Sequence, residues 1–213
     1  MVVHVCERAQ ASGAHSVAVA TDDARILKAV EQAGHRALLT RGDHASGTDR
    51  IAEAAALLGL AAHEIVVNVQ GDEPLIDAGL IKTVAAALEH NREASMSTAC
   101  HPIHDDASLA NPNVVKVVLD AAGYALYFSR SRIPYPREGA APCYRHAGIY
   151  AYRVGFLQKF SALKPSLLEQ TEALEQLRAL WHGFRIAVAV STAEIPPGVD
   201  TPQDLDAVRR MLG

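Results

Sequence analysis

The sequence predicts an α/β fold with a mixed, mainly parallel sheet and a small β-rich lobe inserted in its second half. Short apolar segments alternate with segments of helical periodicity in the first half, as in right-handed βαβ units. The run Ile65–Val67, continued by Val69, is β-branched, does not alternate and is too short for most helices, which is typical of a parallel strand covered on both faces. Two apolar segments flank Asp120–Gly123, a pattern that predicts a hairpin and interrupts the βαβ order.

The first half of the chain supplies most of the predicted helix–strand alternation. A helix is expected at the start, because apolar residues recur on one face and Gly13 can end it. Asp77 can cap another helix that ends near His90. The strands are expected at residues 16–20, 36–39 and 65–69, and the helices at residues 1–12, 24–33, 51–60 and 77–90.

The second half is expected to hold the hairpin and a long irregular segment. Residues 129–146 carry several prolines and arginines, so they are predicted to form a loop over a site. Thr201 can cap the last helix, with Pro202 at its first position. Strands are expected at residues 95–100, 114–119, 124–128, 147–152 and 185–190, and helices or helical turns at residues 105–110, 154–161, 168–181 and 202–212. Residues 1–213 are predicted to form one domain, with a lobe at about residues 111–152.

Composition limits the kinds of partner. A chain of 213 residues with 49% hydrophobic residues can bury a substantial core. Its net charge of −4 gives no general basic field for nucleic acid or membrane binding, and no apolar stretch approaches the roughly 20 residues of a membrane span. The three cysteines are odd in number and widely spaced, which favours reduced thiols in a cytoplasmic protein.

A set of sequence motifs, kept in one order over nearly the whole chain, resembles a single family. The segments are VAVATD (17–22), TRGDHASGTDR (40–50), VNVQGDEP (67–74), NPNVVKVV (111–118), ALYFSR (125–130), HAGIY (146–150), LEQLR (174–178) and GVDTP (198–202). Together they resemble the 3-deoxy-manno-octulosonate cytidylyltransferases, also called CMP-Kdo synthetases. The resemblance implies a Rossmann-like nucleotide-diphospho-sugar transferase fold. It also implies transfer of CMP from CTP to the sugar acid Kdo, with Mg²⁺ as cofactor, release of pyrophosphate, a role in lipopolysaccharide synthesis and a homodimer in the cytoplasm.

Two aspartates are the predicted catalytic and metal-binding residues. Mg²⁺ prefers one or two carboxylates together with phosphate oxygens and water. Asp72 follows the predicted strand at 65–69, and Asp200 precedes the last helix, so each could supply a carboxylate from a strand-to-helix junction. The resemblance places the family's metal ligands at these two positions. The ordinary alternatives are a polar turn after a strand for Asp72 and a helix cap for Asp200.

The resemblance assigns nucleotide binding to residues on two segments. Arg41, Ser46 and Arg50 lie on the segment that resembles the family's cytidine-binding loop, at a predicted helix start. Gln70 and Gly71 are expected to face the nucleotide or sugar, the glycine allowing close backbone approach. A surface turn in which Ser46 or Thr48 caps the helix would account for the first segment without a ligand.

Recognition of Kdo needs a guanidinium for its carboxylate and acceptors for its hydroxyl groups. The resemblance assigns this role to Gln70, Arg130, His146, Glu172 and Glu175. Glu172 and Glu175 are three residues apart on one predicted helix, so they are expected to share a face. A solvated acidic face is the alternative for both glutamates, and a structural role is the alternative for His146.

Other assignments stay open. Lys116 can contact a phosphate or a carboxylate. Tyr127, Phe128 and Trp181 can be dimer anchors, although core positions are favoured. The family also opens with a strand and a PARxxSxRLPGKPL loop that precede the helix found here at the start, so we expect this chain to be poorly active or inactive as a cytidylyltransferase, measured as pyrophosphate release from CTP, Mg²⁺ and Kdo. Competing hypotheses are a cytidylyltransferase for another acid sugar such as a sialic acid, and a non-catalytic nucleotidyltransferase-like subunit.

Overall fold

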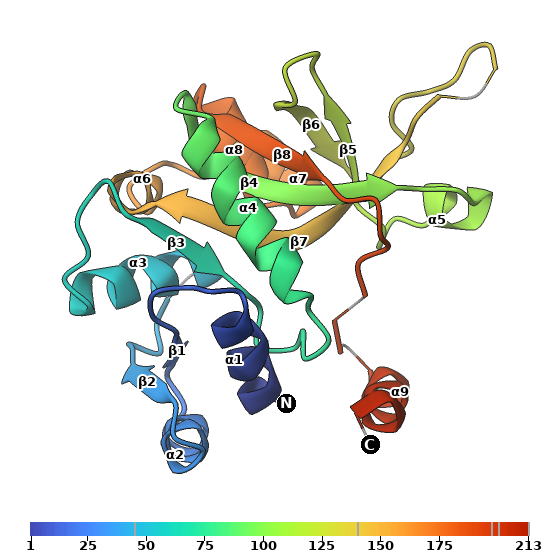
Figure 1. Ribbon diagram of the computed structural model, residues 1–213. Helices are drawn as coiled ribbons and strands as arrows, with labels where there is room; N and C mark the ends of the chain where they lie inside the picture. The colour runs from blue at the N-terminus through green and yellow to red at the C-terminus, as the bar shows by residue number, and fades with distance from the viewer. Residues whose placement is uncertain (45, 140, 197, 200, 213) are drawn as a thin grey trace.

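A six-stranded mixed sheet lies at the centre of the molecule, and a two-stranded parallel sheet lies beside it (Figure 1). The computed structural model describes residues 1–44, 46–139, 141–196, 198–199 and 201–212. The strands are β1 (Ala18–Thr21), β2 (Arg36–Leu39), β3 (Ile65–Asn68), β4 (Ala94–Pro102), β5 (Lys116–Leu119), β6 (Ala125–Ser129), β7 (Tyr144–Arg153) and β8 (Arg185–Val190).

Helices cover both faces of the large sheet. The helices of the described chain are α1 (Val2–Ala11), α2 (Ala24–Gln32), α3 (Gly47–Leu57), α4 (Ala78–His90), α5 (Asp106–Ala110), α6 (Val154–Phe160), α7 (Leu167–Glu172), α8 (Gln176–Trp181) and α9 (Pro202–Leu212). On one face lies α4, and on the other lie α6 and α8. The caps at Asp77 and Thr201 are confirmed: the Asp77 carboxylate accepts from Leu80 N at 3.1 Å, and Thr201 Oγ1 accepts from Asp204 N at 3.2 Å.

The long strand β7 holds the sheet together. One of its edges pairs with β4 from Met96 to Pro102, and its other edge pairs with β3 at one end and with β5 at the other. These three pairings are antiparallel, whereas β4 and β8 are parallel. In the described chain, β3, β4, β5 and β8 therefore run one way and β6 and β7 the other. The mixed α/β fold is confirmed.

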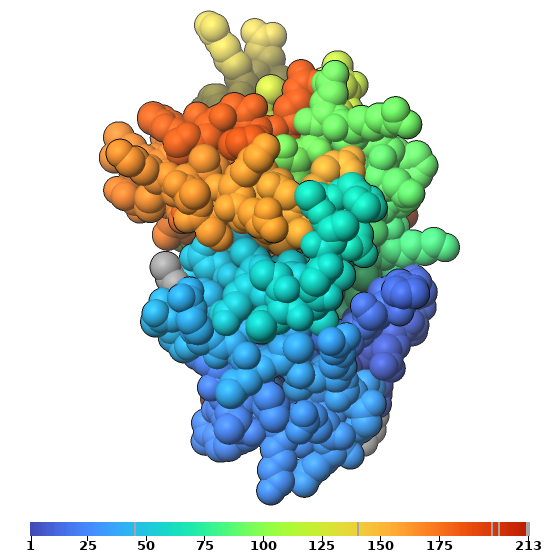
Figure 2. Space-filling view, turned by 90° about the vertical axis from the view of Figure 1, so that its left-hand side faces the viewer, coloured from blue at the N-terminus to red at the C-terminus, as the bar shows by residue number. Residues whose placement is uncertain are grey.

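Strand β3 differs from the expectation in its neighbours. It was expected to be a parallel strand covered on both faces, but its hydrogen-bonded neighbour β7 is antiparallel, and three of its four residues are only partly buried. Among the described residues β1 pairs only with β2, so no strand pairing joins the two sheets. Figure 2 shows the resulting division: β1, α2 and β2 form one end of the molecule, and α6 to α8 lie towards the other.

Two apolar clusters pack on opposite faces of the large sheet. On one face α4 buries Leu80, Val84 and Leu88 against Ala99 of β4 and Ile149 of β7, among others. The opposite cluster joins strand residues to α6 and α8, with Cys100, Phe128, Phe156, Leu177 and Ile186 among its buried members. Adjacent residues Ala99 and Cys100 thus enter different clusters, as expected when side chains alternate along a strand.

The predicted hairpin is confirmed as β5 and β6. Its turn is closed by the Asp120 carboxylate, which accepts from Ala122 N and Tyr124 N, and Gly123 supplies the left-handed residue at φ +83°. Figure 1 shows the segment between β6 and β7 extending away from the sheet, so the described part of this loop does not lie over the sheet.

The predicted helix at residues 168–181 is wrong as a single element. It breaks into α7 and α8 at Ala173, whose φ of 50° and ψ of 52° are left-handed. Of the aromatic residues that could be core or dimer anchors, Phe128 is fully buried and Tyr127 is half-buried. Trp181 is 55% exposed, so the favoured core position is wrong for this residue.

Candidate active site

The segment after β3 presents Gln70, Gly71 and Asp72 at the carboxyl end of that strand. Gln70 and Gly71 are exposed, and Asp72 is half-buried. The carbonyl oxygen of Asp72 accepts from Val199 N at 2.8 Å, and a Cβ added to Gly198 would lie 3.7 Å from Asp72 Cγ. The chain before α9 therefore packs against Asp72. Asp200, the second predicted metal ligand, lies outside the described residues.

The surroundings of Asp72 suit a hard cation. Its side chain is half-buried, and among the described residues no hydrogen bond or ion pair is formed by its carboxylate. A partly buried carboxylate without a protein donor is suited to Mg²⁺, which takes oxygen ligands and retains water and phosphate. The described residues contain no group of three or more metal-binding side chains.

Two of the three side chains predicted to bind nucleotide on the segment at residues 40–50, Ser46 and Arg50, are bonded to other protein groups. Ser46 caps α3: its Oγ accepts from Asp49 N at 3.2 Å and donates to Asp49 Oδ2 at 3.0 Å, so the capping alternative is correct for this hydroxyl. Arg50 donates to Thr40 Oγ1 at 2.7 Å and pairs with Asp22 at 3.2 Å. Arg41 is largely exposed near Asp43, and it is the more available of the two arginines for a ligand.

A chain of polar contacts joins this segment to β7. Thr48 Oγ1 donates to Glu175 Oε2 at 3.0 Å and lies 3.5 Å from the hydroxyl of Tyr152. Glu175 Oε1 is buried and has no partner among the described residues. Burial raises the pKa of Glu175. The structure therefore brings the predicted sugar residue Glu175 to the start of α3, with one oxygen still to be satisfied.

His146 lies on the same face of β7, within an aromatic row. Its ring is 4.9 Å from that of Phe128 and 5.4 Å from that of Tyr150, and Tyr150 stacks on Tyr152 at 5.9 Å. Its Nε2 is 3.0 Å from Thr98 Oγ1. Burial lowers the pKa of His146 to about 3, so the ring is neutral at physiological pH. A neutral ring held in this way suits binding rather than proton transfer.

Arg130 and Glu172 are already hydrogen-bonded within the protein, each to the segment that carries the other. The Glu172 carboxylate accepts from Ser129 Oγ at 2.6 Å and from Arg130 N at 2.9 Å. The Arg130 guanidinium donates to the carbonyl oxygens of Glu172, Pro112 and Ala173. The expectation that Glu172 and Glu175 share one helical face is wrong, because the break at Ala173 separates them: Glu172 faces the end of β6 and Glu175 faces α3.

Lys116 is not available to a phosphate. Its side chain is fully buried, and Nζ donates to the carbonyl oxygens of Asn111, Val114 and Arg130 at 3.0, 2.6 and 2.5 Å. Burial lowers its pKa. Three backbone acceptors satisfy all three ammonium protons, so Lys116 holds the segment before β5 against the end of β6.

Comparison with known proteins assigns the chain to a family. A family model described as cytidylyltransferase matches residues 1–186. The 3-deoxy-manno-octulosonate cytidylyltransferase of Acidovorax sp. (strain JS42) is 57% identical and aligns with 100% of this chain and 87% of its own length. The chain belongs to the 3-deoxy-manno-octulosonate cytidylyltransferase family. The enzyme of that name from Methylibium petroleiphilum is 55% identical, over 100% of this chain and 85% of its own length.

Solved structures agree with this family. CMP:2-keto-3-deoxy-manno-octonic acid synthetase complexed with CTP superposes with a TM-score of 0.93 at 43% identity, covering 99% of this chain and 86% of that one. A 4-diphosphocytidyl-2C-methyl-D-erythritol synthase superposes with a TM-score of 0.63 at 14% identity, covering 100% and 88%, and shares the fold alone. No helix in the described part of this cytidylyltransferase is long and apolar enough to cross a membrane.

Sequence reasoning missed several polar residues of this 3-deoxy-manno-octulosonate cytidylyltransferase family member. Thr48, Tyr150 and Tyr152 connect α3 to β7, and Thr98 holds His146. The available signal was the alternation of Tyr150 and Tyr152 on the face that carries His146. Thr48 gave no signal beyond its capping propensity, because its partner Glu175 is 127 residues away in the sequence.

Proposed function

We propose that this chain transfers CMP from CTP to Kdo and releases pyrophosphate. The observation that carries the proposal is the contact between Thr48 and Glu175, which joins the predicted cytidine segment to the predicted sugar residues. The family relationship supports the same reaction, because the similar proteins are named for it and one was solved with CTP.

Different residues of the site would bind the nucleotide, the sugar and the metal ion. Arg41 and the exposed Gln70–Gly71 backbone would contact the nucleotide, and Ser46 and Arg50 would shape the loop that receives it. His146 and the free oxygen of Glu175 would receive the hydroxyl groups of Kdo. Asp72 would hold Mg²⁺ together with Asp200, and the bound ion would neutralise charge on the phosphates. Arg130 and Glu172 would bind sugar only after exchanging the contacts described above.

The test is a turnover assay with a matched pair of variants. The purified chain is given CTP, Mg²⁺ and either Kdo or N-acetylneuraminate, and pyrophosphate release is followed while the sugar nucleotide is identified by mass spectrometry. We expect turnover with Kdo, and a fall in kcat on the order of 100-fold for Asp72→Asn, since one transition-state contact to the phosphates is lost.

Asp77→Asn is the control, because asparagine also caps a helix and α4 should be unaffected. Turnover with N-acetylneuraminate alone would identify a sialic acid cytidylyltransferase. No turnover with either sugar, together with no CTP binding by calorimetry, would support the non-catalytic subunit.

We also propose a homodimer in which the lobe at residues 111–152 contributes to both sugar binding and the subunit contact. Large apolar side chains are exposed beside the lobe: Leu126 on β6 is 60% exposed, Leu167 on α7 is 67% exposed, and Trp181 at the end of α8 is 55% exposed. Helix α8 contacts both β6 and α7, so these residues lie on neighbouring elements.

We propose the cytoplasm as the compartment. Cys6, Cys100 and Cys143 are free and buried, and thiols of this kind are stable in a reducing environment. Cell fractionation with an antibody to the chain would test this assignment, and recovery with the periplasmic fraction would contradict it.

A further inference from the structure

Two side chains of α3 hold both backbone polar groups of Arg41. The Arg41 N–H donates to Glu53 Oε2 at 3.1 Å, and its carbonyl oxygen accepts from the Arg50 guanidinium at 3.4 Å. Glu53 and Arg50 are three residues apart on one helix, so they can share a face. The Arg41 side chain is 69% exposed. The helix therefore fixes the main chain at Arg41 and leaves its guanidinium accessible.

The same carboxylate oxygen of Glu53 also holds His44. His44 Nε2 is hydrogen-bonded to Glu53 Oε2, and the His44 side chain is only 4% exposed. This hydrogen bond is the main cause that lowers the pKa of Glu53, so the carboxylate is ionised at neutral pH and can only accept hydrogens. His44 Nε2 therefore carries the proton. One half-buried carboxylate thus binds two positions of the segment at residues 41–44.

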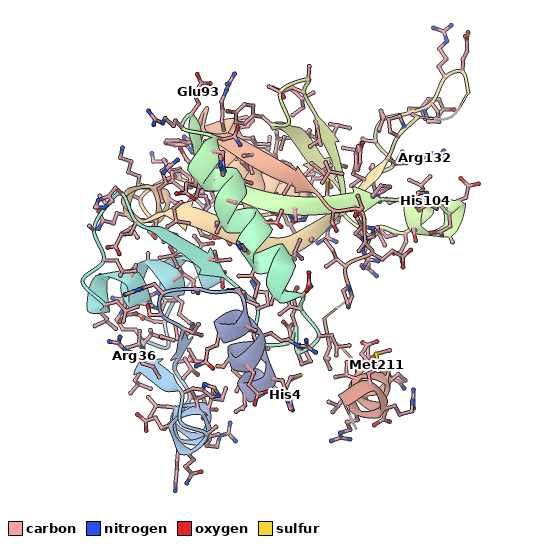
Figure 3. All side chains as sticks on the ribbon, viewed as in Figure 1. His4, Arg36, Glu93, His104, Arg132 and Met211 are labelled. Atoms are coloured by element: carbon pink, nitrogen blue, oxygen red, sulfur yellow. The ribbon has the colours of Figure 1, made fainter. Side chains whose placement is uncertain are left out.

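The chain just before Arg41 is fixed as well. Thr40 is buried; its N–H donates to the carbonyl oxygen of Thr21 at 2.9 Å, and its Oγ1 accepts from Arg50 at 2.7 Å. Figure 3 shows Arg36 at the start of β2, below α3 in this view, and Arg41 lies just beyond the other end of that strand. The strand and the helix together leave the backbone at Arg41 little freedom.

The Arg41 side chain keeps donors for an anion. Both of its ion pairs are made through Nε, at 3.5 Å from Asp43 and 3.9 Å from Glu53, so the two terminal nitrogens can make a bidentate contact with a phosphate. Glu53 itself has the same sign of charge as a triphosphate and would repel it. Its contribution to nucleotide binding therefore has to act through the residues that it holds.

We propose that Glu53 is a positioning residue for nucleotide binding, which together with His44 fixes the main chain at Arg41 so that the guanidinium is presented to the phosphates of CTP. Fixing a binding group in advance raises affinity, because less ordering is required when the ligand binds. The inference rests on the proposed function, since it names what holds the nucleotide-binding segment in place.

The test is isothermal titration calorimetry of the full chain with CTP and Mg²⁺, with circular dichroism to show that each variant is folded. Glu53→Ala should raise the dissociation constant for CTP about tenfold, because Arg41 and His44 lose their shared acceptor. In Glu53→Gln the carboxamide oxygen can still accept from both donors, so this variant should bind CTP within about threefold of the parent. Rescue by glutamine distinguishes a lost acceptor from a general folding defect.

A double-variant comparison shows whether Glu53 acts through Arg41. Arg41→Ala should itself weaken CTP binding, and adding Glu53→Ala to it should cause little further loss, because there is no guanidinium left to position. Independent roles would instead multiply the two losses. Arg36→Ala, at an exposed position on β2, and Glu89→Ala, at an exposed position on α4, are the matched controls and should bind CTP as the parent does.

Two outcomes would overturn this inference alone: a parent chain that binds CTP no better than Glu53→Ala does, or a Glu53→Ala loss that is equally large in the Arg41→Ala background. A parent chain that binds no CTP would overturn the proposed function together with this inference. The two failures are therefore distinguishable, and none of these measurements requires turnover.

Discussion

Glu73 makes the stability of the fold depend on pH. Burial and, to a smaller extent, the neighbouring Asp72 raise the pKa of Glu73 from 4.5 to about 7. A carboxyl group whose pKa is higher in the folded chain binds its proton more tightly there, so ionisation opposes folding. The stability that protonated Glu73 contributes is therefore lost as the pH rises from about 4.5 through about 7.

Glu73→Gln keeps this position neutral at every pH. We expect the variant to gain stability relative to the parent as the pH rises through that range, with a constant difference above it. Urea unfolding at a series of pH values measures the difference. Glu89→Gln, at an exposed position on α4, is the control. A difference that does not change with pH for Glu73→Gln would show that burial does not penalise its charge.

For single residues, the sequence predicted which residues have a structural or functional role better than it predicted which residues they contact. Ser46 was correctly expected near a helix start, because capping depends on the next three residues. The partner of Glu175 could not be inferred, since α8 and α3 meet only through the tertiary fold. The arrangement of Asp72 against the chain at Gly198 also depends on segments remote in sequence.

The segment before β5 is fastened by one buried ammonium group. Lys116→Met would remove three hydrogen bonds and leave buried carbonyl oxygens without donors. We expect the free energy of unfolding to fall by about 3 kcal/mol. Lys82→Met, at an exposed position on α4, should change it by less than about 0.5 kcal/mol. If Lys116→Met and Lys82→Met lowered the free energy of unfolding equally in urea, the three hydrogen bonds from Lys116 to carbonyl oxygens would contribute no stability.

The break between α7 and α8 has a cost that glycine should relieve. Ala173 adopts φ 50° while its side chain is exposed, so replacing it with glycine removes strain without removing packing. Ala173→Gly should raise the unfolding free energy by about 1 kcal/mol. Ala85→Gly within α4 should lower it by about 1 kcal/mol. Thermal unfolding of both variants checks the pair, and a loss of stability in Ala173→Gly would contradict the assignment.

Element positions were largely predictable because they follow local periodicity and caps. The hairpin, the strands at 36–39 and 185–190 and the cap at Asp77 all depend on nearby residues. The helix break at Ala173 could not be predicted from the sequence, because alanine does not favour a left-handed conformation. The carbonyl groups at the break are held by Arg130, which lies 42 and 43 residues earlier.

Subunit association can be tested through the exposed tryptophan. Trp181→Ser removes a large apolar side chain from the proposed dimer surface, and the dimer dissociation constant should rise on the order of 100-fold. Leu57→Ser, at a position on α3 that is 56% exposed, should leave it unchanged. Sedimentation velocity over a range of concentrations measures both. A monomeric parent chain, or equal weakening by the two changes, would contradict the proposed surface.

The position of β7 has a consequence for the order in which the chain acquires structure during synthesis. Strands β3, β4 and β5 each pair with β7, which begins only at Tyr144. Until that strand has emerged from the ribosome, these three earlier segments lack the partner that they share. Sheets built from such distant pairings fold slowly and expose aggregation-prone edges meanwhile. We therefore expect the nascent chain to be more prone to aggregation before β7 emerges than after it has paired.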